Sequence, residues 1–329
     1  MNNLVRSNLS HSFNEATHIN PSSLTGSEWY GKTLPKAEFI NCTCNWGLFR
    51  GRNITLRKPI QFMTGVGDIT KRGRILKYDT EPVLNFWEKG SKCDAIEGAW
   101  DSSTIPTKIT KDMELDIFIA LMCRKSLMVY EKEVEQNGVK GIRFKPRKNF
   151  LGTPDDPDPE VRNPDNACYC LKNDPRFKCF KSGVIDMKPC KRDSMAPLAL
   201  SQPHFYEADQ SFRDALEGMD PSKEKHEFYM DVHQKFGFPI AMRPKFQLNL
   251  VIGRYIDPTW DVIDKMPEEI VWPFLWAEDG FARPSDEMRD AIKFGEDAPK
   301  LLTMLGAVVF FVLGGCLLLT ALIYFCWSR

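Results

Sequence analysis

The feature that most constrains this chain is an uncharged apolar run close to its C-terminus. Residues 301–327 carry no charged side chain and lie between Lys300 and Arg329. A helix of about 26 residues rises about 39 Å, which exceeds the ~30 Å hydrocarbon core of a bilayer and allows some tilt. A buried core helix is the alternative, but core helices rarely stay apolar on every face over this length. The run therefore predicts a membrane-spanning helix over residues 300–327.

The flanking charges do not orient this span. Arg329 is the only charged residue after the run. The positive-inside rule compares lysines and arginines on the two sides of a span, and one residue is too few for that comparison. Residues 1–23 contain no apolar core of a signal peptide. We therefore expect either a tail-anchored protein that faces the cytosol or a chain that lacks its true beginning. The cysteines and glycosylation sequons are the features that indicate on which side of the membrane the body lies.

Ten cysteines occur in the chain, and Cys316 and Cys326 lie within or at the edge of the apolar run. The other eight are an even number, which fits a disulfide framework. A zinc site is one alternative, but structural zinc usually draws on more widely spaced cysteine pairs than Cys168 and Cys170. A catalytic thiol is another, but no nucleophile signature surrounds any cysteine. Disulfides require an oxidising compartment.

Three N-x-[ST] sequons indicate the same compartment, with acceptors at Asn8, Asn41 and Asn53. Each tripeptide alone is a weak signal, because such triplets occur often by chance. Together with the cysteines they predict that the residues before Lys300 lie outside the cytosol. Cys326 then lies at the cytosolic end of the span and is a palmitoylation candidate.

The body of the chain has the pattern of a mainly β structure. Residues 48–252 hold short β-type runs broken by turn signals, which favours one large, mainly antiparallel sheet system. The Asn137-Gly138 dipeptide between two extended runs predicts a hairpin. Residues 152–166 are too rich in proline and aspartate for a helix or central strand, and predict an exposed loop rather than a calcium site. Residues 286–294 predict a short helix before the span.

Residues 245–252 alternate between apolar and polar side chains, which predicts a half-buried strand. One face would carry Phe246, Leu248, Leu250 and Ile252, and the other Lys245, Gln247 and Asn249.

Eight segments, in order along the chain, carry a family resemblance. They are NFWEKGSKCDAIEGAW (85–100), LMCRKSL (121–127), NPDNACYC (163–170), CFKSGVIDMKPC (179–190), PLALSQPHFYEADQSF (197–212), LEGMDPSKEKHEFYMDVHQKFGFPI (216–240), KFQLNLVI (245–252) and VWPFLWAEDG (271–280). These segments resemble the class B scavenger receptor family, which includes the fatty-acid translocase, the high-density-lipoprotein receptor, lysosomal integral membrane protein and insect sensory neuron membrane proteins. The resemblance covers roughly residues 46–327, which correspond to the C-terminal two-thirds of the family domain.

The resemblance implies a mainly β fold with some α: an antiparallel β-barrel-like ectodomain with an internal hydrophobic tunnel, plus one C-terminal transmembrane helix. It also implies three disulfides, where spacing alone leaves the connectivity open. These are Cys93–Cys168, Cys123–Cys190 and Cys170–Cys179. Cys42 and Cys44 fall outside the family pattern, and their pairing is open.

Family members normally have a second span near the N-terminus and a helical apex region before the part matched here. The resemblance therefore implies that the N-terminal part of the family domain is missing, as in a fragment, a truncated gene model or a divergent isoform. The expected organisation has four parts. These are a divergent, poorly ordered segment over 1–45, a partial scavenger-receptor-type ectodomain over 46–299, the transmembrane helix over 300–327 and a cytosolic end at 328–329.

The function that the resemblance implies is that of a membrane-anchored receptor with no catalytic residue, cofactor or metal. It would bind lipids or lipoproteins and pass lipid through the tunnel to the plasma membrane. The implied lipids are fatty acids, sterol esters and anionic phospholipids. The tunnel-lining candidates, for each of which core packing is the alternative, are Phe246, Leu248, Leu250, Trp272 and Phe274.

Other readings stay open beside this one. An endolysosomal sorting receptor that binds a protein ligand would lie in the lysosomal membrane, a metal-dependent enzyme is a third hypothesis, and homo-oligomerisation is undecided. Nucleic acid is not an expected partner, because lysine plus arginine equals aspartate plus glutamate at 44 each. His204, His226 and Asp231 match the family pattern and are expected to be structural. Basic clusters at 71–77 and 143–148 are expected on a solvated surface, with anionic lipid as the alternative.

Overall fold

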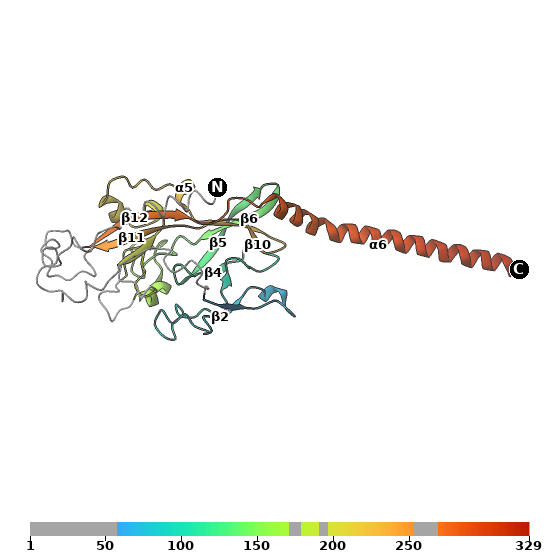
Figure 1. The fold of residues 1–329 in the computed structure, drawn as a ribbon, viewed down its shortest axis with the longest axis horizontal. Coiled ribbons are helices and arrows are strands. Elements are labelled where there is room, and N and C mark those ends of the chain that lie inside the picture. The colour runs from blue at the N-terminus through green and yellow to red at the C-terminus, as the bar shows by residue number, and fades with distance from the viewer. Residues whose placement is uncertain (1–57, 171–178, 191–196, 253–268, 329) are drawn as a thin grey trace, which may run out of the picture.

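The computed structural model describes residues 58–170, 179–190, 197–252 and 269–328. Within them, β-strands form a body from which one long helix projects (Figure 1). The prediction of a mainly β fold with one C-terminal apolar helix is confirmed.

The largest sheet has six strands in the order β10-β9-β6-β5-β4-β3. All neighbours pair antiparallel except β3 and β4, which pair parallel. The strands are β3 (Trp100–Asp101), β4 (Leu115–Ile119), β5 (Arg124–Gln136), β6 (Val139–Pro146), β9 (Tyr229–His233) and β10 (Phe238–Arg243).

A second sheet has four antiparallel strands in the order β12-β11-β8-β7, and a third consists of β1 and β2. These strands are β1 (Ile60–Phe62), β2 (Ile75–Tyr78), β7 (Val184–Asp186), β8 (Leu198–Ser201), β11 (Lys245–Ile252) and β12 (Ile270–Glu278). The helical segments are η2 (Ile69–Lys71), η3 (Pro164–Tyr169), η5 (Pro203–Phe205), α4 (Gln210–Asp214), α5 (Lys223–His226) and α6 (Asp286–Trp327).

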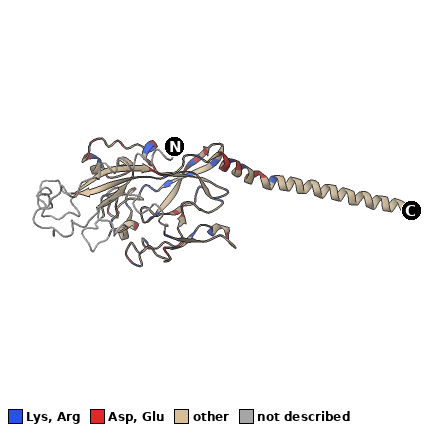
Figure 2. Cartoon of the chain, in the orientation of Figure 1, with Lys and Arg blue, Asp and Glu red and all other residues tan. Residues whose placement is uncertain are grey.

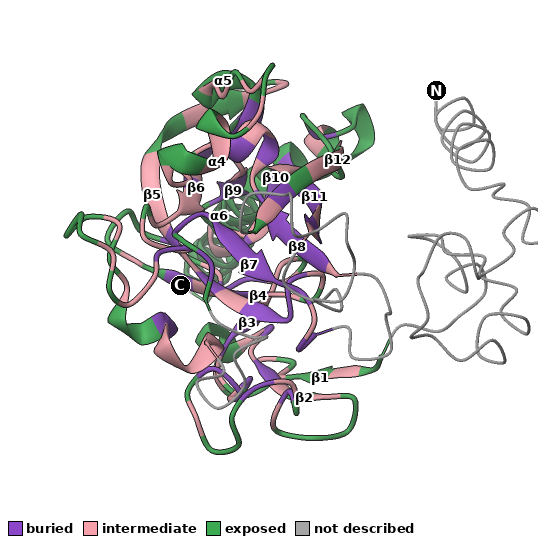
Figure 3. Cartoon of the chain, turned by 90° about the vertical axis from the view of Figure 1, so that its left-hand side faces the viewer, coloured by how far each residue is buried: buried purple, intermediate pink, exposed green. Residues whose placement is uncertain are grey.

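The two larger sheets curl into a half-barrel around a shared core (Figure 3). Its largest buried cluster takes Ile75 from β2, Phe118 from β4, Leu200 from β8 and Leu248 from β11. These side chains come from all three sheets, so burial of apolar surface at this one cluster holds the sheets together.

The predicted hairpin is present between β5 and β6. Gln136 pairs with Val139, which leaves Asn137 and Gly138 as a two-residue turn. Both turn residues have positive φ, at 50° and 74°. This is the conformation that the Asn-Gly dipeptide favours, because asparagine tolerates and glycine freely adopts left-handed backbone.

The prediction of a half-buried β11 was wrong. Lys245, Gln247 and Asn249 are only 4%, 2% and 0% exposed, so the polar face of the strand is buried, while Phe246, Leu250 and Ile252 on the apolar face are only partly buried. The reason is that β11 lies between β8 and β12 while η5 covers its polar face, where the His204 amide donates to Gln247 Oε1 at 2.9 Å.

Residues 152–166 form the predicted loop up to the start of η3, and its middle is exposed. The loop is closed at its end by Asn166, which is buried. The Asn166 side-chain amide donates to the carbonyls of Phe150 at 3.0 Å and Gly152 at 2.7 Å. These bonds tie the two ends of the loop together.

Helix α6 joins two segments that were predicted apart. The short helix over 286–294 and the span continue as one helix from Asp286 to Trp327, with Pro299 inside it. Charged side chains appear on its first turns and give way to an uncharged stretch (Figure 2). Among the described residues, α6 is the one helix that is long and apolar enough to cross a membrane.

The base of α6 is docked against the body. Ile292 is buried with Val139 of β6 and Ile240 of β10, and Phe236 and Phe238 pack against this cluster. Further contacts join the Asn137 side-chain amide to the Pro284 carbonyl at 3.2 Å and His233 Nε2 to Glu296 Oε1 at 3.4 Å. The ten or so residues after Asp286 therefore belong to the body, about three helical turns.

Candidate lipid-binding face

All five tunnel-lining candidates lie on the neighbouring strands β11 and β12. Leu248 is 2% exposed and belongs to the largest core cluster, so core packing describes it. Phe246, Leu250 and Phe274 are half-buried against the same cluster. Trp272 is 50% exposed, on the outer strand of the sheet. The five candidates thus range from a buried core residue to a half-exposed surface residue across two strands. The tunnel itself stays a prediction.

A β-bulge changes the direction of the side chains along β12. Leu248 of β11 pairs with Leu275, but the next residue, Asn249, pairs with Pro273. Phe274 is therefore the extra residue of the bulge, which the register between β11 and β12 skips. Among the described residues β12 lies at the edge of its sheet, which is where a proline, with no backbone N–H, is tolerated in a strand.

The bulge places the two tryptophans of β12 on opposite faces. Residues four apart in a regular strand share a face, but Trp272 pairs with Leu250 on the apolar face and Trp276 with Gln247 on the polar face. The residue pattern alone does not predict this reversal, because Pro273 becomes a signal for it only once the position of β12 in the sheet is known. Trp276 is 44% exposed, close to the value for Trp272.

On the polar face, Trp276 contacts two stacked histidines. The rings of His204 and His226 lie parallel, with centroids 4.5 Å apart, and the Trp276 ring meets them edge-on at 6.5 and 5.9 Å. Each histidine accepts a backbone hydrogen bond at Nδ1, from Asp220 at 3.2 Å and from Ser222 at 2.9 Å. Both Nδ1 atoms are thus acceptors, which is the neutral form with hydrogen on Nε2.

Burial lowers the pKa of His226, the electrostatic effects of the neighbouring His204, Lys245 and Lys225 lower it further, and Asp220 opposes the shift. The expected structural role fits this arrangement, because each ring caps a local backbone segment. The backbone at His204 and Phe205 has φ of 54° at both residues. Such a conformation is costly for a bulky residue, and it is held by Gln247 and by Arg213, whose Nη1 donates to the Phe205 carbonyl at 2.9 Å.

Lys245 is a buried ammonium at the start of β11. Its Nζ has no hydrogen-bond partner among the described residues, and Glu278 Oε2 lies 3.9 Å away. Burial, followed by the neighbouring Arg243 charge, lowers its pKa. Glu278 is already engaged by Arg243 through Nε and Nη2. The ammonium is therefore desolvated while its nearest carboxylate is shared with Arg243, which compensates only part of the cost.

Asp231 is fully buried on β9 and accepts three side-chain hydrogen bonds. Arg143 donates from Nε at 2.6 Å and from Nη2 at 2.8 Å, and Gln136 Nε2 donates at 2.8 Å. The bidentate pair joins β9 to β6, with the guanidinium 3.5 Å from the centroid of the Tyr229 ring. Asp231 is thus satisfied within the fold, as a structural residue.

The two basic clusters are largely occupied by intramolecular partners. Four side chains of 143–148 pair with carboxylates, in the pairs Arg143–Asp231, Lys145–Glu227, Arg147–Glu114 and Lys148–Glu160. In 71–77, Lys71 pairs with Asp68, and Arg72 and Arg74 donate to backbone carbonyls.

Three disulfides brace the part of the body beside β4, β5 and β7. They join Cys93 to Cys168, Cys123 to Cys190 and Cys170 to Cys179, with Cα–Cα distances of 5.8, 5.8 and 4.9 Å. These distances are ordinary for disulfides, and the pairs are those that the family resemblance implied. None of these six sulfurs is a free thiolate that could ligate zinc.

Two of the disulfides flank an aromatic cluster around Arg124. Its guanidinium carbon lies 4.0 Å from the Tyr169 ring centroid and 5.2 Å from that of Trp87. The two rings meet edge-on at 4.8 Å, and Trp87 Nε1 donates to the Cys123 carbonyl at 2.8 Å. Burial lowers the pKa of Arg124 to about 10, so it stays charged at neutral pH. Cation–π contacts stabilise that charge in place of water.

Only some of the predicted modification sites lie within the residues that the structure describes. Asn8, Asn41 and Asn53 lie outside them, as do Cys42 and Cys44. Cys316 and Cys326 are free and exposed on α6. Palmitoylation of Cys326 stays a prediction.

Comparison with known proteins gives a consistent group of relatives. A family model described as the CD36 family matches residues 20–325. Protein peste of Drosophila melanogaster is 31% identical over 270 residues, which is 82% of this chain and 43% of peste. Human lysosome membrane protein 2 is 30% identical over 212 residues, 64% of this chain and 41% of that protein. Rat scavenger receptor class B member 1 is 27% identical over 285 residues, 85% and 51% respectively.

The chain spans about half the length of these curated relatives, between 41% and 51% of each. The match nevertheless extends over nearly all of this chain, through the cysteine-rich part, the β-sheets and the long helix. The chain therefore belongs to the CD36 family, whose members are receptors rather than enzymes.

Proposed function

We propose that this chain is a membrane-anchored lipid receptor that holds an acyl chain against the apolar face of β11 and β12 and delivers it to the bilayer. The observation that carries the proposal is the half-covered face formed by Phe246, Leu250, Trp272 and Phe274. Soluble proteins usually bury such side chains or use them for binding. An acyl chain gains about 0.8 kcal/mol per buried methylene on such a surface.

Delivery to the bilayer requires no catalytic group. The transfer of an acyl chain between two apolar environments changes little free energy, so a continuous apolar passage suffices. The family's scavenger receptor members support this reading, since receptors of lipid or lipoprotein particles must accommodate lipid outside the membrane. The proposed ligands are fatty acids, sterol esters, anionic phospholipids and lipoproteins that carry them.

The tryptophans of β12 provide a matched test. The full chain in lipid nanodiscs is incubated with a photoactivatable fatty-acid analogue, and saturable labelling is measured against unlabelled competitor. Trp272→Ala should weaken binding about tenfold, since losing such a contact costs at least ~1.4 kcal/mol. Trp276→Ala removes a side chain of similar exposure from the opposite face and should leave binding unchanged. The proposal fails if labelling is not saturable or if both variants lose it equally.

The proposal also assigns the body to the extracytosolic side and the span to residues 300–327. The disulfides support this, because such bonds persist in oxidising compartments. Glycosidase treatment of cell-expressed protein should increase its mobility on a gel. If all three sites carry a glycan, each of the substitutions Asn8→Gln, Asn41→Gln and Asn53→Gln should reduce the glycosidase-dependent mobility shift by the contribution of one glycan. A chain with no glycan and reduced cysteines would contradict the assignment.

A sorting receptor of the endolysosomal system is the second candidate function, with the lysosomal membrane in place of the plasma membrane. His226, stacked on His204, favours it, because histidine is the side chain whose charge ordinarily changes over the pH range of that pathway. Localisation of the tagged full chain in cells separates the two. Accumulation in acidic organelles would favour sorting, and retention at the cell surface would favour the lipid receptor.

A further inference from the structure

The segment between β1 and β2 exposes apolar side chains that have no place in the core. Val66 is 93% exposed, and Phe62 and Ile69 are each 47% exposed. Val66 stands between Gly65 and Gly67, whose φ angles of 82° and 84° are left-handed. This backbone turns the chain sharply and leaves the valine at the tip of the loop. We call residues 62–72 the Val66 loop.

Hydrogen bonds attach the Val66 loop to the turn between β9 and β10. Arg72 Nη2 donates to the carbonyls of Phe236 at 2.7 Å and Gly237 at 3.1 Å. The same turn lies against α6, where a Cβ placed on Gly295 would come within 3.0 Å of the Phe236 ring. His233, at the start of the turn, lies 3.4 Å from Glu296. The loop, the turn and the base of α6 are therefore one connected end of the body.

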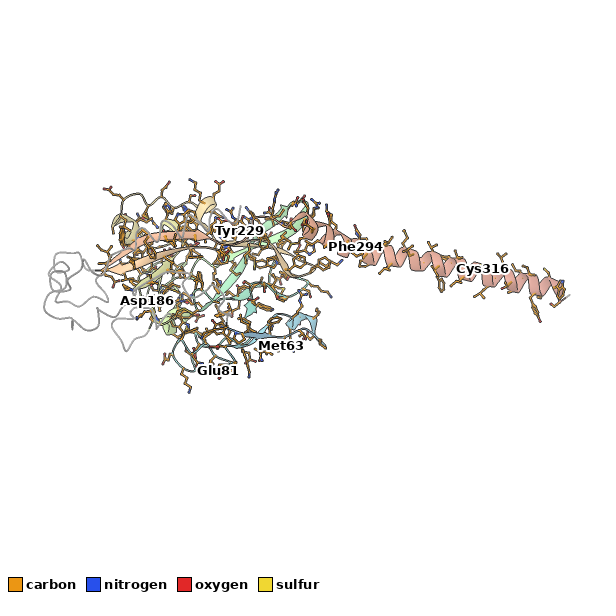
Figure 4. The ribbon with its side chains drawn as sticks, in the orientation of Figure 1. Met63, Glu81, Asp186, Tyr229, Phe294 and Cys316 are labelled. Atoms are coloured by element: carbon orange, nitrogen blue, oxygen red, sulfur yellow. A yellow bond between two sulfur atoms is a disulfide. The ribbon has the colours of Figure 1, made fainter. Side chains whose placement is uncertain are left out.

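This end faces the direction in which the span leaves the body. The Val66 loop and the start of α6 lie on the same side of the molecule (Figure 1), and Met63 lies toward that side while Glu81 lies further back (Figure 4). The uncharged run begins at Leu301, five residues after Glu296. Five residues of helix rise about 8 Å, which is about the depth of one headgroup layer. With the hydrocarbon boundary placed at Leu301, the turn contacting Glu296 comes to the level of the headgroups.

We propose that the Val66 loop is a second membrane contact, which inserts Val66, Phe62 and Ile69 into the interfacial layer of the bilayer that α6 crosses. Continuity with the span argues for lipid as the occupant, because the loop is joined to helix residues within two turns of the hydrocarbon boundary. Lys71, which lies in the loop and pairs with Asp68 at 3.5 Å, and Lys235, in the turn that Arg72 contacts, are both exposed, and such lysines extend their ammonium groups to lipid phosphates.

The contact would act as a second anchor point beside the helix. A single helix leaves the body free to rotate about the helix axis and to tilt. A loop held in the interface at a distance from that axis opposes both motions. It thereby presents the same end of the body to the membrane, whatever ligand the β11–β12 face accepts.

The test uses the full chain in lipid nanodiscs, with an environment-sensitive fluorescent amino acid encoded at one position. At position 66 its emission should shift to the blue and should lose intensity when the nanodisc lipid carries a shallow quencher. The matched control has the same probe at Glu81, an exposed position on the β2 side of the body. It should show water-like emission and no quenching.

A second variant separates insertion from a merely apolar local environment. Phe62→Asp together with Ile69→Asp should return the emission of the probe at 66 to that of the Glu81 control, with the far-ultraviolet circular dichroism unchanged. Water-like emission at 66 in the parent chain would overturn the proposal. So would a blue shift without lipid quenching, which would indicate a protein partner or a second copy over the loop.

Discussion

Lys245 is a side chain whose burial lowers the stability of the fold. Its ammonium is removed from water, has no hydrogen-bond partner among the residues described and lies 3.9 Å from a carboxylate that Arg243 already binds. Desolvating a charge without such compensation opposes folding. The position therefore contributes little to stability.

Replacing this lysine should stabilise the fold. Lys245→Met keeps the aliphatic volume and removes the buried charge, and should raise the free energy of unfolding by about 1 kcal/mol or more. Chemical denaturation in detergent measures it. Lys293→Met, at an exposed position on α6, should stay within ~0.5 kcal/mol of the parent. A loss of stability in Lys245→Met would show that the ammonium is paired in solution.

His226 should make the fold sensitive to acid. The pKa of His226 is lowered in the folded chain, so the unfolded chain binds protons first as pH falls. Stability should be complete above the unfolded pKa of about 6.5 and should decrease below it until the folded pKa is passed. Protonation would also place positive charge beside His204, Lys245 and Lys225.

The variant His226→Asn tests this dependence. Its side-chain oxygen can accept the Ser222 amide in place of Nδ1, without titrating. Unfolding free energies at about pH 7.5 and pH 5 should differ less in the variant than in the parent. An equal difference in both would assign the acid sensitivity to other groups.

Residue patterns predicted some of these environments and missed others. The Asn137-Gly138 turn is a local property, so the dipeptide was sufficient. The burial of Gln247 and Asn249 depends on η5, more than 40 residues earlier in the chain, and on Ser201, to which both amides are bonded. Alternation in a strand reports which residues share a face, but it does not report what covers that face.

At the scale of elements, a buried ion pair joins the strands of the six-stranded sheet. Asp231→Ala removes the acceptor of three hydrogen bonds and leaves Arg143 without its counter-charge. The loss should be about 3–5 kcal/mol of unfolding free energy. The control is Glu133→Ala on β5, which breaks the exposed pair with Lys111 and should cost ~0–1 kcal/mol. Similar losses in the two variants would contradict this ranking.

Elements were more predictable than the irregularities within them. The strands around residues 124–146 and 245–252 follow from β propensity and turn signals. The bulge at Phe274 does not, because the same residues fit a regular strand. The position of Pro273 becomes informative only once β12 is known to lie at a sheet edge. The face that each tryptophan occupies, and with it the candidate lipid contact, therefore required the structure.

At the scale of the whole molecule, Pro299 separates the docked part of α6 from the span. Proline has no backbone N–H, so the Gly295 carbonyl lacks its usual helical donor. The helix is continuous here, but it is weakest between the body and the membrane. Any tilt that the Val66 loop leaves to the body should therefore be centred on this position.

Restoring the missing hydrogen bond should restrict that tilt. In Pro299→Ala, distances measured by pulsed electron resonance between spin labels at positions 81 and 328 in nanodiscs should have a narrower distribution. Ala298→Ser leaves the backbone ladder intact and should match the parent. An unchanged width in Pro299→Ala would locate the flexibility elsewhere.

The overall arrangement was predictable where composition and order along the chain determine it. The apolar run predicts the span, and its continuation into a body-docked helix was missed because Pro299 reads as a boundary in sequence. The packing of that base depends on Phe236 and Ile240, which only the fold brings to the helix.

The amides on β11 have a consequence for how the domain is assembled on its anchor. A slip of this strand by one position, about 3.4 Å, would turn Gln247 and Asn249 toward leucines and leave their polar atoms without partners. The buried polar atoms that such mispairing leaves without hydrogen bonds raise its free energy, so the native register is favoured. Because β12 pairs with β11 and then leads into α6, the register of β11 also fixes the point at which the long helix leaves the body.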